Sequence, residues 1–221
     1  MTRYVQLAMR RNGLHAIRGW CLNQLHLCPG TSMLNSGNDL EGDSWFAWTI
    51  KRYTPGEIVA LAEESPFITL ESIPLDDALW IVERLHARLI LHVRSLKNWL
   101  ASSLRISRDR DGETNMPLHR ECVETWKAYD RAFRGLHAPF LTAFRYDTWT
   151  SDATYRKYVA NRLGVSDYDG SPYQRVHGIE YSSFDGNAYD GRASEMDLLH
   201  RDKCLQDDPE FQELLKLGAT K

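Results

Sequence analysis

The chain has 221 residues, of which 27 are basic and 30 acidic, giving a formal net charge of −3. This length suits one α/β domain with a sizeable core, and the lack of a basic excess argues against nucleic acid as a partner. The four cysteines form no CxxC pair and so give no zinc pattern. Because the sequence also shows no signal peptide and no apolar run of about 20 residues, we expect free thiols, no membrane segment and a cytoplasmic protein.

Strand and helix signals alternate through the first part of the sequence. We expect a strand at 4–9, a helix at 15–27, a Gly-, Ser- and Asn-rich loop at 31–43, a helix that opens at Thr54-Pro55 and ends near Glu64, a strand at 67–71 and a helix capped by Asp76.

The alternation continues to the end of the chain. We expect a buried strand at 88–94, a helix at 97–106, a charged surface loop at 108–115, a helix at 117–134, a strand at 140–146, a helix at 151–163 stopped by Gly164, irregular structure at 167–191 and a last helix from Pro209 to Gly218. Such alternation predicts parallel βαβ units. We therefore predict a single α/β domain over residues 1–221, with a central parallel sheet flanked by helices on both faces and a lid region near 165–203.

A first anion-binding motif follows the first predicted strand and reads Arg10-Arg11-Asn12-Gly13-Leu14-His15-Ala16-Ile17. A helix N-terminus presents free backbone N–H groups and the positive end of the helix dipole, so it binds phosphate or sulfate. A glycine lets such a ligand approach the backbone closely. The motif is neither a Walker A loop nor a G-x-G-x-x-G fingerprint. It predicts an anion site in a P-loop-like strand–loop–helix, where the first strand meets the first helix.

A second motif consists of Arg94, at the end of the predicted strand 88–94, and Ser102, eight residues further on in the next helix. The guanidinium can form charge-assisted bonds to a phosphate, and the hydroxyl can donate another. By themselves the two residues are equally compatible with an ion pair and a neutral helix serine. Two such motifs in one α/β chain indicate a ligand with phosphate-type groups at both ends.

Together the two motifs resemble the sulfotransferases that use 3′-phosphoadenosine 5′-phosphosulfate (PAPS). In that family the first loop binds the 5′-phosphosulfate, and an Arg and a Ser bind the 3′-phosphate. The matching positions are Arg11, Asn12, Gly13, Leu14, His15 and Ala16 in the loop, and Arg94 and Ser102 at the 3′-phosphate. The loop departs from the family's Lys-Ser-Gly-Thr-Thr: Arg11 keeps a cation, Leu14 offers only its backbone N–H, and His15 could restore a side-chain donor.

Later segments are similar to the same family. Residues 144–147 (FRYD) look like its Tyr-Glu-Asp-Leu segment at a strand end, residues 162–164 (RLG) resemble its Phe-Leu-Gly helix end, and residues 181–192 resemble the late loop that closes over the 3′-phosphate. The resemblance extends over residues 4–203. It assigns Arg192 to the 3′-phosphate, with Arg201 and Lys203 as rivals.

The resemblance implies an enzyme that moves a sulfuryl group from PAPS to a hydroxyl or amine of a small-molecule or carbohydrate acceptor, releases 3′,5′-adenosine bisphosphate (PAP) and needs no metal. Such transfer requires in-line positioning, charge stabilisation and a base for the acceptor's proton. Glu71 is the expected base, because it ends the strand beside the first loop, and residues 71–74 (ESIP) resemble the family's Glu-Lys-Ser-Pro segment. His15 is the rival base, Arg11 is the expected cation, and Arg10 is expected to be a backup or a surface residue.

Other residues and functions complete these expectations. Three aromatic residues could line an acceptor pocket, namely Trp45, Phe46 and Trp48, and His92 is expected to be a core histidine. The family's frequent dimers suggest a homodimer. Two alternatives stay open: a P-loop kinase for a small metabolite, which magnesium dependence would favour, and a non-catalytic nucleotide-binding protein with the same fold, for which Asn12 and Leu14 would be signs of a decayed loop.

Overall fold

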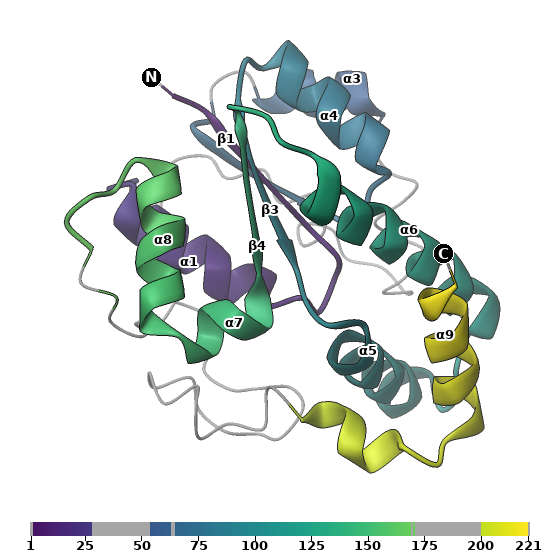
Figure 1. Cartoon of the computed structure of the whole chain (residues 1–221). Helices are drawn as coiled ribbons and strands as arrows, with labels where there is room; N and C mark the ends of the chain where they lie inside the picture. The colour runs from purple at the N-terminus through teal and green to yellow at the C-terminus, as the bar shows by residue number, and fades with distance from the viewer. Residues whose placement is uncertain (1, 28–53, 63–64, 169, 171–199, 221) are drawn as a thin grey trace.

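A four-stranded parallel sheet forms the centre of the molecule (Figure 1). The computed structural model describes residues 2–27, 54–62, 65–168, 170 and 200–220. The strands lie in the order β2-β1-β3-β4 and are β1 (Tyr4–Ala8), β2 (Phe67–Glu71), β3 (Arg88–Val93) and β4 (Leu141–Arg145). All three neighbouring pairs are parallel. The predicted α/β class is confirmed, and the strand at 67–71 has the predicted bounds.

The register aligns the carboxyl ends of the strands at one edge of the sheet. Ala8 pairs with Glu71 across β1 and β2, and Val93 pairs with Arg145 across β3 and β4. Ligands of open parallel sheets bind at this edge. The segments that follow β1, β2, β3 and β4 therefore come together there, although they are far apart in the sequence.

Helices cover both faces of the sheet, as predicted. They are α1 (Leu14–Gln24), α3 (Pro55–Ala62), α4 (Leu75–Arg84), α5 (Leu96–Asp111), α6 (Met116–Gly135), α7 (Tyr146–Ser151), α8 (Ala153–Leu163) and α9 (Pro209–Ala219), with a short 3₁₀-helix η1 (Arg201–Leu205) before α9. Figure 1 shows α1 and α8 on one side of the sheet and α3, α4 and α6 on the other.

Each face has its own apolar core. Val5 and Leu7 of β1 pack with residues of α3, α4, α5, α6 and α9, whereas Ile90 and Phe144 pack with residues of α1 and α8. Every residue of β1 and β2 is buried, as expected for parallel strands covered on both faces. Because helices pack on both faces of the sheet, the position of its carboxyl edge, which carries the candidate site, is fixed by the core.

The predicted loop at 108–115 is wrong. Helix α5 continues to Asp111, Gly112 ends it in a left-handed conformation (φ 74°), and Asn115 caps α6 by accepting a hydrogen bond from Leu118 N (3.2 Å). Of the charged residues that suggested a loop, Arg108 and Asp109 have ion-pair partners on helices. Arg105 lies 3.6 Å from Asp109 one helical turn away, and Arg108 reaches α9.

Two helix starts also differ from the prediction. Asp76 lies in the first turn of α4, not at its cap, because Pro74 occupies the N-cap position. The helix expected at 151–163 is α8, which begins two residues later, after Asp152 accepts hydrogen bonds from Thr154 N (2.7 Å) and Tyr155 N (3.1 Å). The short helix α7 before it was not predicted. Gly164 ends α8 at φ 90°, as predicted.

Candidate anion-binding and active site

The loop between β1 and α1 contains two residues in the left-handed conformation. Arg11 has φ 67°, and Gly13, at the N-cap of α1, has φ 78°. This conformation is easy for glycine and costly for arginine. The helix begins at Leu14, one residue earlier than expected. The first turn of α1 therefore opens at the carboxyl edge of the sheet.

Three backbone carbonyl groups of this loop accept hydrogen bonds from side chains of the surrounding elements. The bonds are Trp99 Nε1 to the carbonyl of Arg10 (2.7 Å), Arg94 Nη1 to that of Arg11 (3.2 Å) and Gln6 Nε2 to that of Leu14 (3.0 Å). The first amides of a helix have no acceptor within the helix. Because the carbonyls are held on the protein side, the loop is suited to present those amides to an anion.

Two features require glycine at position 13: the left-handed backbone conformation and the close approach of a neighbouring side chain. A Cβ at this position would overlap the ring of Tyr146, the first residue of α7. The same ring lies against the guanidinium of Arg94, with Cζ 5.4 Å from the ring centroid. Tyr146 thus joins the first loop to Arg94, and only glycine leaves room for it.

Glu71 lies beside this loop, as the sequence predicts. It ends β2 opposite Ala8 and is only 7% exposed. Burial raises the pKa of its carboxyl group, and the positive charges of Arg10 and Arg11 lower it. Of the two expectations for Arg10, a backup or a surface residue, the second is wrong, because the residue is only 6% exposed. Burial is the larger effect, so the pKa of Glu71 is raised overall, and a carboxyl group with a raised pKa is suited to accept a proton.

Arg94 lies directly after β3, as predicted, and has several partners. Besides its bond to Arg11, its Nε lies 3.9 Å from a carboxylate oxygen of Asp147, and its own carbonyl accepts a hydrogen bond from Trp126 Nε1 (3.0 Å). The side chain is 2% exposed. In this structure Arg94 therefore holds the first loop in place, a role that the sequence motif does not indicate.

Asp147 also organises the start of α5. Its carboxylate accepts hydrogen bonds from Ser95 N (2.5 Å) and from Asn98 Nδ2 (3.3 Å). Ser95 is the N-cap of α5, yet its own side chain makes no capping bond. An acidic group at a helix N-terminus is stabilised by the unpaired amides and the dipole. The FRYD segment thus supplies the cap of a helix whose N-cap residue, Ser95, lies 52 residues earlier in the chain.

Ser102 meets one of the three candidate cations of the late segment. It is fully buried in α5, and its hydroxyl accepts a hydrogen bond from Arg201 Nη1 (3.0 Å). The backbone of Arg201 also donates to Asn98 Oδ1 (3.1 Å). Lys203 is exposed on η1, and Arg192 lies outside the described residues. Among the described candidates, Arg201 is therefore the cation that the fold brings to Ser102.

Several predicted site residues lie partly or wholly outside the described part of the structure. His15 and Ala16 lie in the first turn of α1, but the side chain of His15 is outside the described part of the structure. The aromatic residues of 45–48, the expected loop at 31–43 and most of the expected irregular segment at 167–191 are also outside it.

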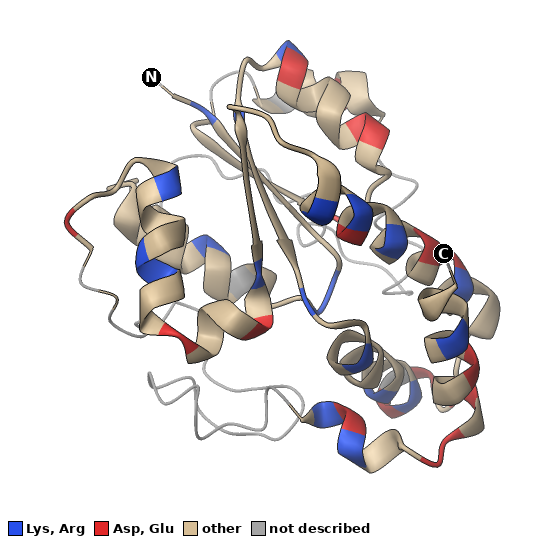
Figure 2. Ribbon diagram, viewed as in Figure 1, with Lys and Arg blue, Asp and Glu red and all other residues tan. Residues whose placement is uncertain are grey.

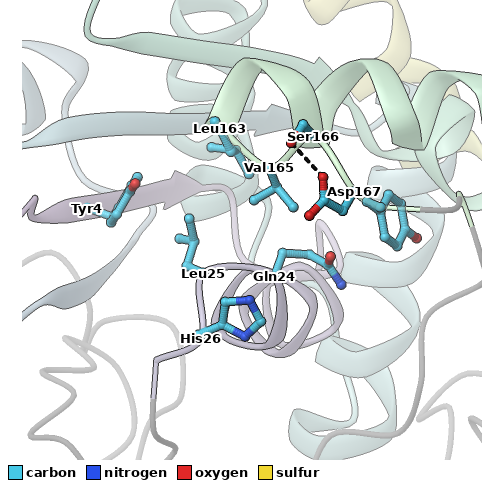
Figure 3. Close-up of a pocket in the computed structure, with 10 residues that line it drawn as sticks. Tyr4, Gln24, Leu25, His26, Leu163, Val165, Ser166 and Asp167 are labelled. Carbon is cyan, nitrogen blue, oxygen red and sulfur yellow. Dashed lines mark hydrogen bonds between the residues drawn. The ribbon is translucent and has the colours of Figure 1, made fainter.

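A cavity of about 560 Å³ lies at the opposite end of the sheet (Figure 3). Tyr4, the first residue of β1, contributes to its wall, as do the last turns of α1 and α8. Its lining residues are Tyr4, Gln24, Leu25, His26, Leu163, Gly164, Val165, Ser166, Asp167 and Tyr168. Because the strands are parallel, this amino-terminal edge is separate from the edge that carries Glu71 and Arg94.

In the part of the chain that the structure describes, no three His, Cys, Asp or Glu side chains come together as a metal site, and no helix is long and apolar enough to cross a membrane. Cys21, Cys122 and Cys204 are free thiols, as predicted.

No family model matches the sequence, and no curated protein matches it either. Among solved structures, the chain is similar to that of mouse sulfotransferase SULT7A1 complexed with PAP. The two sequences are 13% identical, and the TM-score is 0.47. The similarity covers 76% of this chain and 60% of the mouse chain, so it leaves out more than a third of the latter. At this level of likeness, function has to be inferred from the site residues themselves.

Proposed function

We propose that the chain is a sulfotransferase that moves a sulfuryl group from PAPS to a hydroxyl or amine of a small-molecule or carbohydrate acceptor. The observation that carries this proposal is the junction of β1, β2 and α1. There the backbone carbonyl groups of the loop accept hydrogen bonds from protein side chains. Glu71, a buried carboxylate whose pKa is influenced by the positive charges of Arg10 and Arg11, lies beside this loop. Anion binding and proton acceptance are both needed for this reaction.

In this proposal the loop Arg11 to Ala16 binds the phosphosulfate. The acceptor oxygen or nitrogen attacks the sulfur, the bond from sulfur to the phosphate oxygen of PAPS breaks, and PAP leaves with that bond's electron pair. Glu71 takes the proton of the acceptor. Arg11 and the amides at the start of α1 stabilise the charge that develops on the leaving phosphate. His15 remains the alternative base.

Arg94 and Ser102 are proposed to bind the 3′-phosphate. Arg201 is the preferred third group because it is already bonded to Ser102, and Arg192 remains the alternative from the late segment. Lys97 is less suited, since its ammonium lies 3.3 Å from a carboxylate oxygen of Asp202 and its side chain is 54% exposed.

Calorimetric titration of the purified chain with PAP, beside ATP with magnesium and 5′-AMP, tests the proposal. We expect selective binding of PAP, and PAP at about 100 times its Kd should stabilise the fold by about 2.7 kcal/mol. Arg94→Ala should abolish this binding. Arg134→Ala is the matched control, because this arginine is 68% exposed on α6 and pairs with Asp130.

The competing functions predict different titrations. Preference for ATP with magnesium would support a small-metabolite kinase in place of a sulfotransferase. PAP binding without turnover of any acceptor would support a non-catalytic binding protein. Failure to bind any of the three nucleotides would reject the nucleotide-dependent functions altogether.

A further inference from the structure

A buried polar cluster lies on the sheet beneath the first loop, in an otherwise apolar core. Gln6 of β1 and His92 of β3 are fully buried, and Thr69 of β2 is 2% exposed. These strands are neighbours in the sheet (Figure 1). A buried polar group is costly unless it is hydrogen-bonded. The anion-binding motifs do not include these residues, so their presence needs its own explanation.

The hydrogen bonds fix the orientation of the Gln6 amide. Its Nε2 lies 3.0 Å from the carbonyl oxygen of Leu14 and 2.9 Å from Nε2 of His92, and its Oε1 lies 3.4 Å from the hydroxyl of Thr69. A carbonyl can only accept, so the amide nitrogen faces Leu14. Both amide protons are then used, one toward Leu14 and one toward His92.

This orientation determines the protonation state of His92. Because Gln6 donates to Nε2 of the imidazole, that nitrogen accepts, and the neutral ring carries its proton on Nδ1. Burial lowers the pKa of His92 to about 3, and hydrogen bonding to the backbone of Asn12 acts in the opposite direction. Asn12 Nδ2 also approaches the backbone carbonyl of His92 at 3.4 Å, a contact that does not involve the imidazole. The imidazole itself lies between Gln6 and the backbone of Asn12 in the loop.

We infer that Gln6 and neutral His92 are positioning residues that fix the position of the backbone of the loop Asn12–Leu14 relative to the sheet. The position of this backbone in turn determines the affinity for the donor nucleotide. This inference rests on the proposed function. Neither residue would touch the ligand. Gln6 acts through the carbonyl of Leu14, and the imidazole of His92 acts through Gln6 and the backbone of Asn12. Leu14 has only its backbone N–H to offer an anion, so the placement of that backbone matters directly.

The affinity test uses two shape-conserving substitutions. Gln6→Met removes both amide donors, and His92→Phe keeps a ring that can stack on Phe144, whose centroid lies 5.7 Å away. Each single variant should weaken PAP binding about tenfold, equivalent to about 1.4 kcal/mol. The double variant should lose less than the product of the two, because it removes both partners of the Gln6–His92 hydrogen bond together and leaves neither of them unpaired across it. Val159→Ala is the control, since it thins the same apolar core from α8 without touching these hydrogen bonds.

A second readout does not depend on any ligand. Nitrogen NMR of the imidazole should show a neutral ring protonated on Nδ1 at neutral pH, and Gln6→Met should change that signature. Amide hydrogen exchange at 12–17 should be faster in Gln6→Met than in Val159→Ala at matched global stability. A merely structural role would lower stability without this local difference.

The outcomes separate the inference from the function on which it rests. Loss of PAP affinity in both single variants but not in the control supports the inference. Unchanged affinity, or a ring protonated on Nε2, overturns it even if the wild type binds PAP. If the wild type binds no PAP, the proposed function fails, and faster exchange confined to 12–17 would still support a loop-positioning role while uniform exchange would reject it.

Discussion

The chemistry of the proposed reaction depends on one carboxyl group, that of Glu71. Burial raises its pKa and the charges of Arg10 and Arg11 lower it, with burial the larger effect, so that the pKa is raised overall. The charge of Glu71 in turn contributes to raising the pKa of the Tyr129 hydroxyl. A base must be ionised to accept a proton, so turnover should rise with pH through an inflection above the usual glutamate pKa of about 4.3. Glu71→Gln should lower kcat by about 10²-fold or more and remove this inflection, while the Kd of PAP changes little. Steady-state pH profiles of both proteins provide the measurement, and undiminished turnover would transfer the role of base to His15.

Gly13 offers a second prediction for a single residue. Alanine there would have to adopt φ 78° and would overlap the ring of Tyr146. The backbone and packing costs together should lower the free energy of unfolding by about 2 kcal/mol or more. Urea denaturation measures this change, with Gly56→Ala as the control because a Cβ at Gly56 meets nothing within 4 Å. Equal stability of the two variants would show that Tyr146 does not close on the loop.

Among the helices, α5 has a start that depends on another element. Asp147, from α7, supplies the cap that Ser95 does not, and it also lies near Arg94. Asp147→Ala should cost more stability than Asp152→Ala, which removes only the local cap of α8 and should cost about 1 kcal/mol. Asp147→Asn should fall between wild type and alanine, since it keeps an acceptor and loses the charge. Thermal unfolding measures the stability of these variants, and hydrogen exchange at 95–98 reports on the start of α5. Equal losses of stability in Asp147→Ala and Asp152→Ala would contradict the prediction.

At the scale of the whole molecule, the C-terminal helix is attached by ion pairs as well as apolar contacts. Arg108 of α5 lies 2.6 Å from Asp208 and 2.5 Å from Glu210, while Phe211 and Leu214 of α9 are buried in the core. Basic and acidic residues are interspersed along α6 and η1 as well (Figure 2). These ion pairs join the neighbouring helices α5 and α9 and do not involve the residues of the candidate site at the carboxyl edge of the sheet.

This attachment predicts a specific acid sensitivity. Hydrogen bonding to Arg108 holds the pKa of Asp208 below its usual value, so the stabilisation is complete above the unfolded pKa of about 3.9. It is lost as pH falls through the lower pKa of the folded state. Asp208→Asn keeps the cap on Phe211 N and loses the charge. Its stability deficit, about 1 kcal/mol near neutral pH, should shrink below about pH 4. A deficit that is independent of pH in urea titrations would contradict the ion-pair account.

The sequence predicted the strands and most helices because their signals are local. Residues 67–71 include the apolar residues Phe67, Ile68 and Leu70 and follow Ser65-Pro66, Thr54-Pro55 opens a helix, and Gly164 ends one. The error at 108–115 has the opposite cause. The charged residues there suggested a loop, but the partner of Arg108, Asp208 at the start of α9, lies 100 residues later in the chain.

By itself, the sequence determined the alternating α/β order, the glycine at the helix start, and the residues Arg11, Glu71, Arg94 and Ser102 as candidates. It could do so because hydrophobic periodicity and turn chemistry act between neighbours in the chain. Only the tertiary structure decided that Arg94 and Trp99 hold the loop's carbonyls, that Arg201 meets Ser102, and that Asp147 caps α5. Each of these contacts joins segments about 50 to 100 residues apart. They exist because parallel strands bring their carboxyl ends to one edge of the sheet.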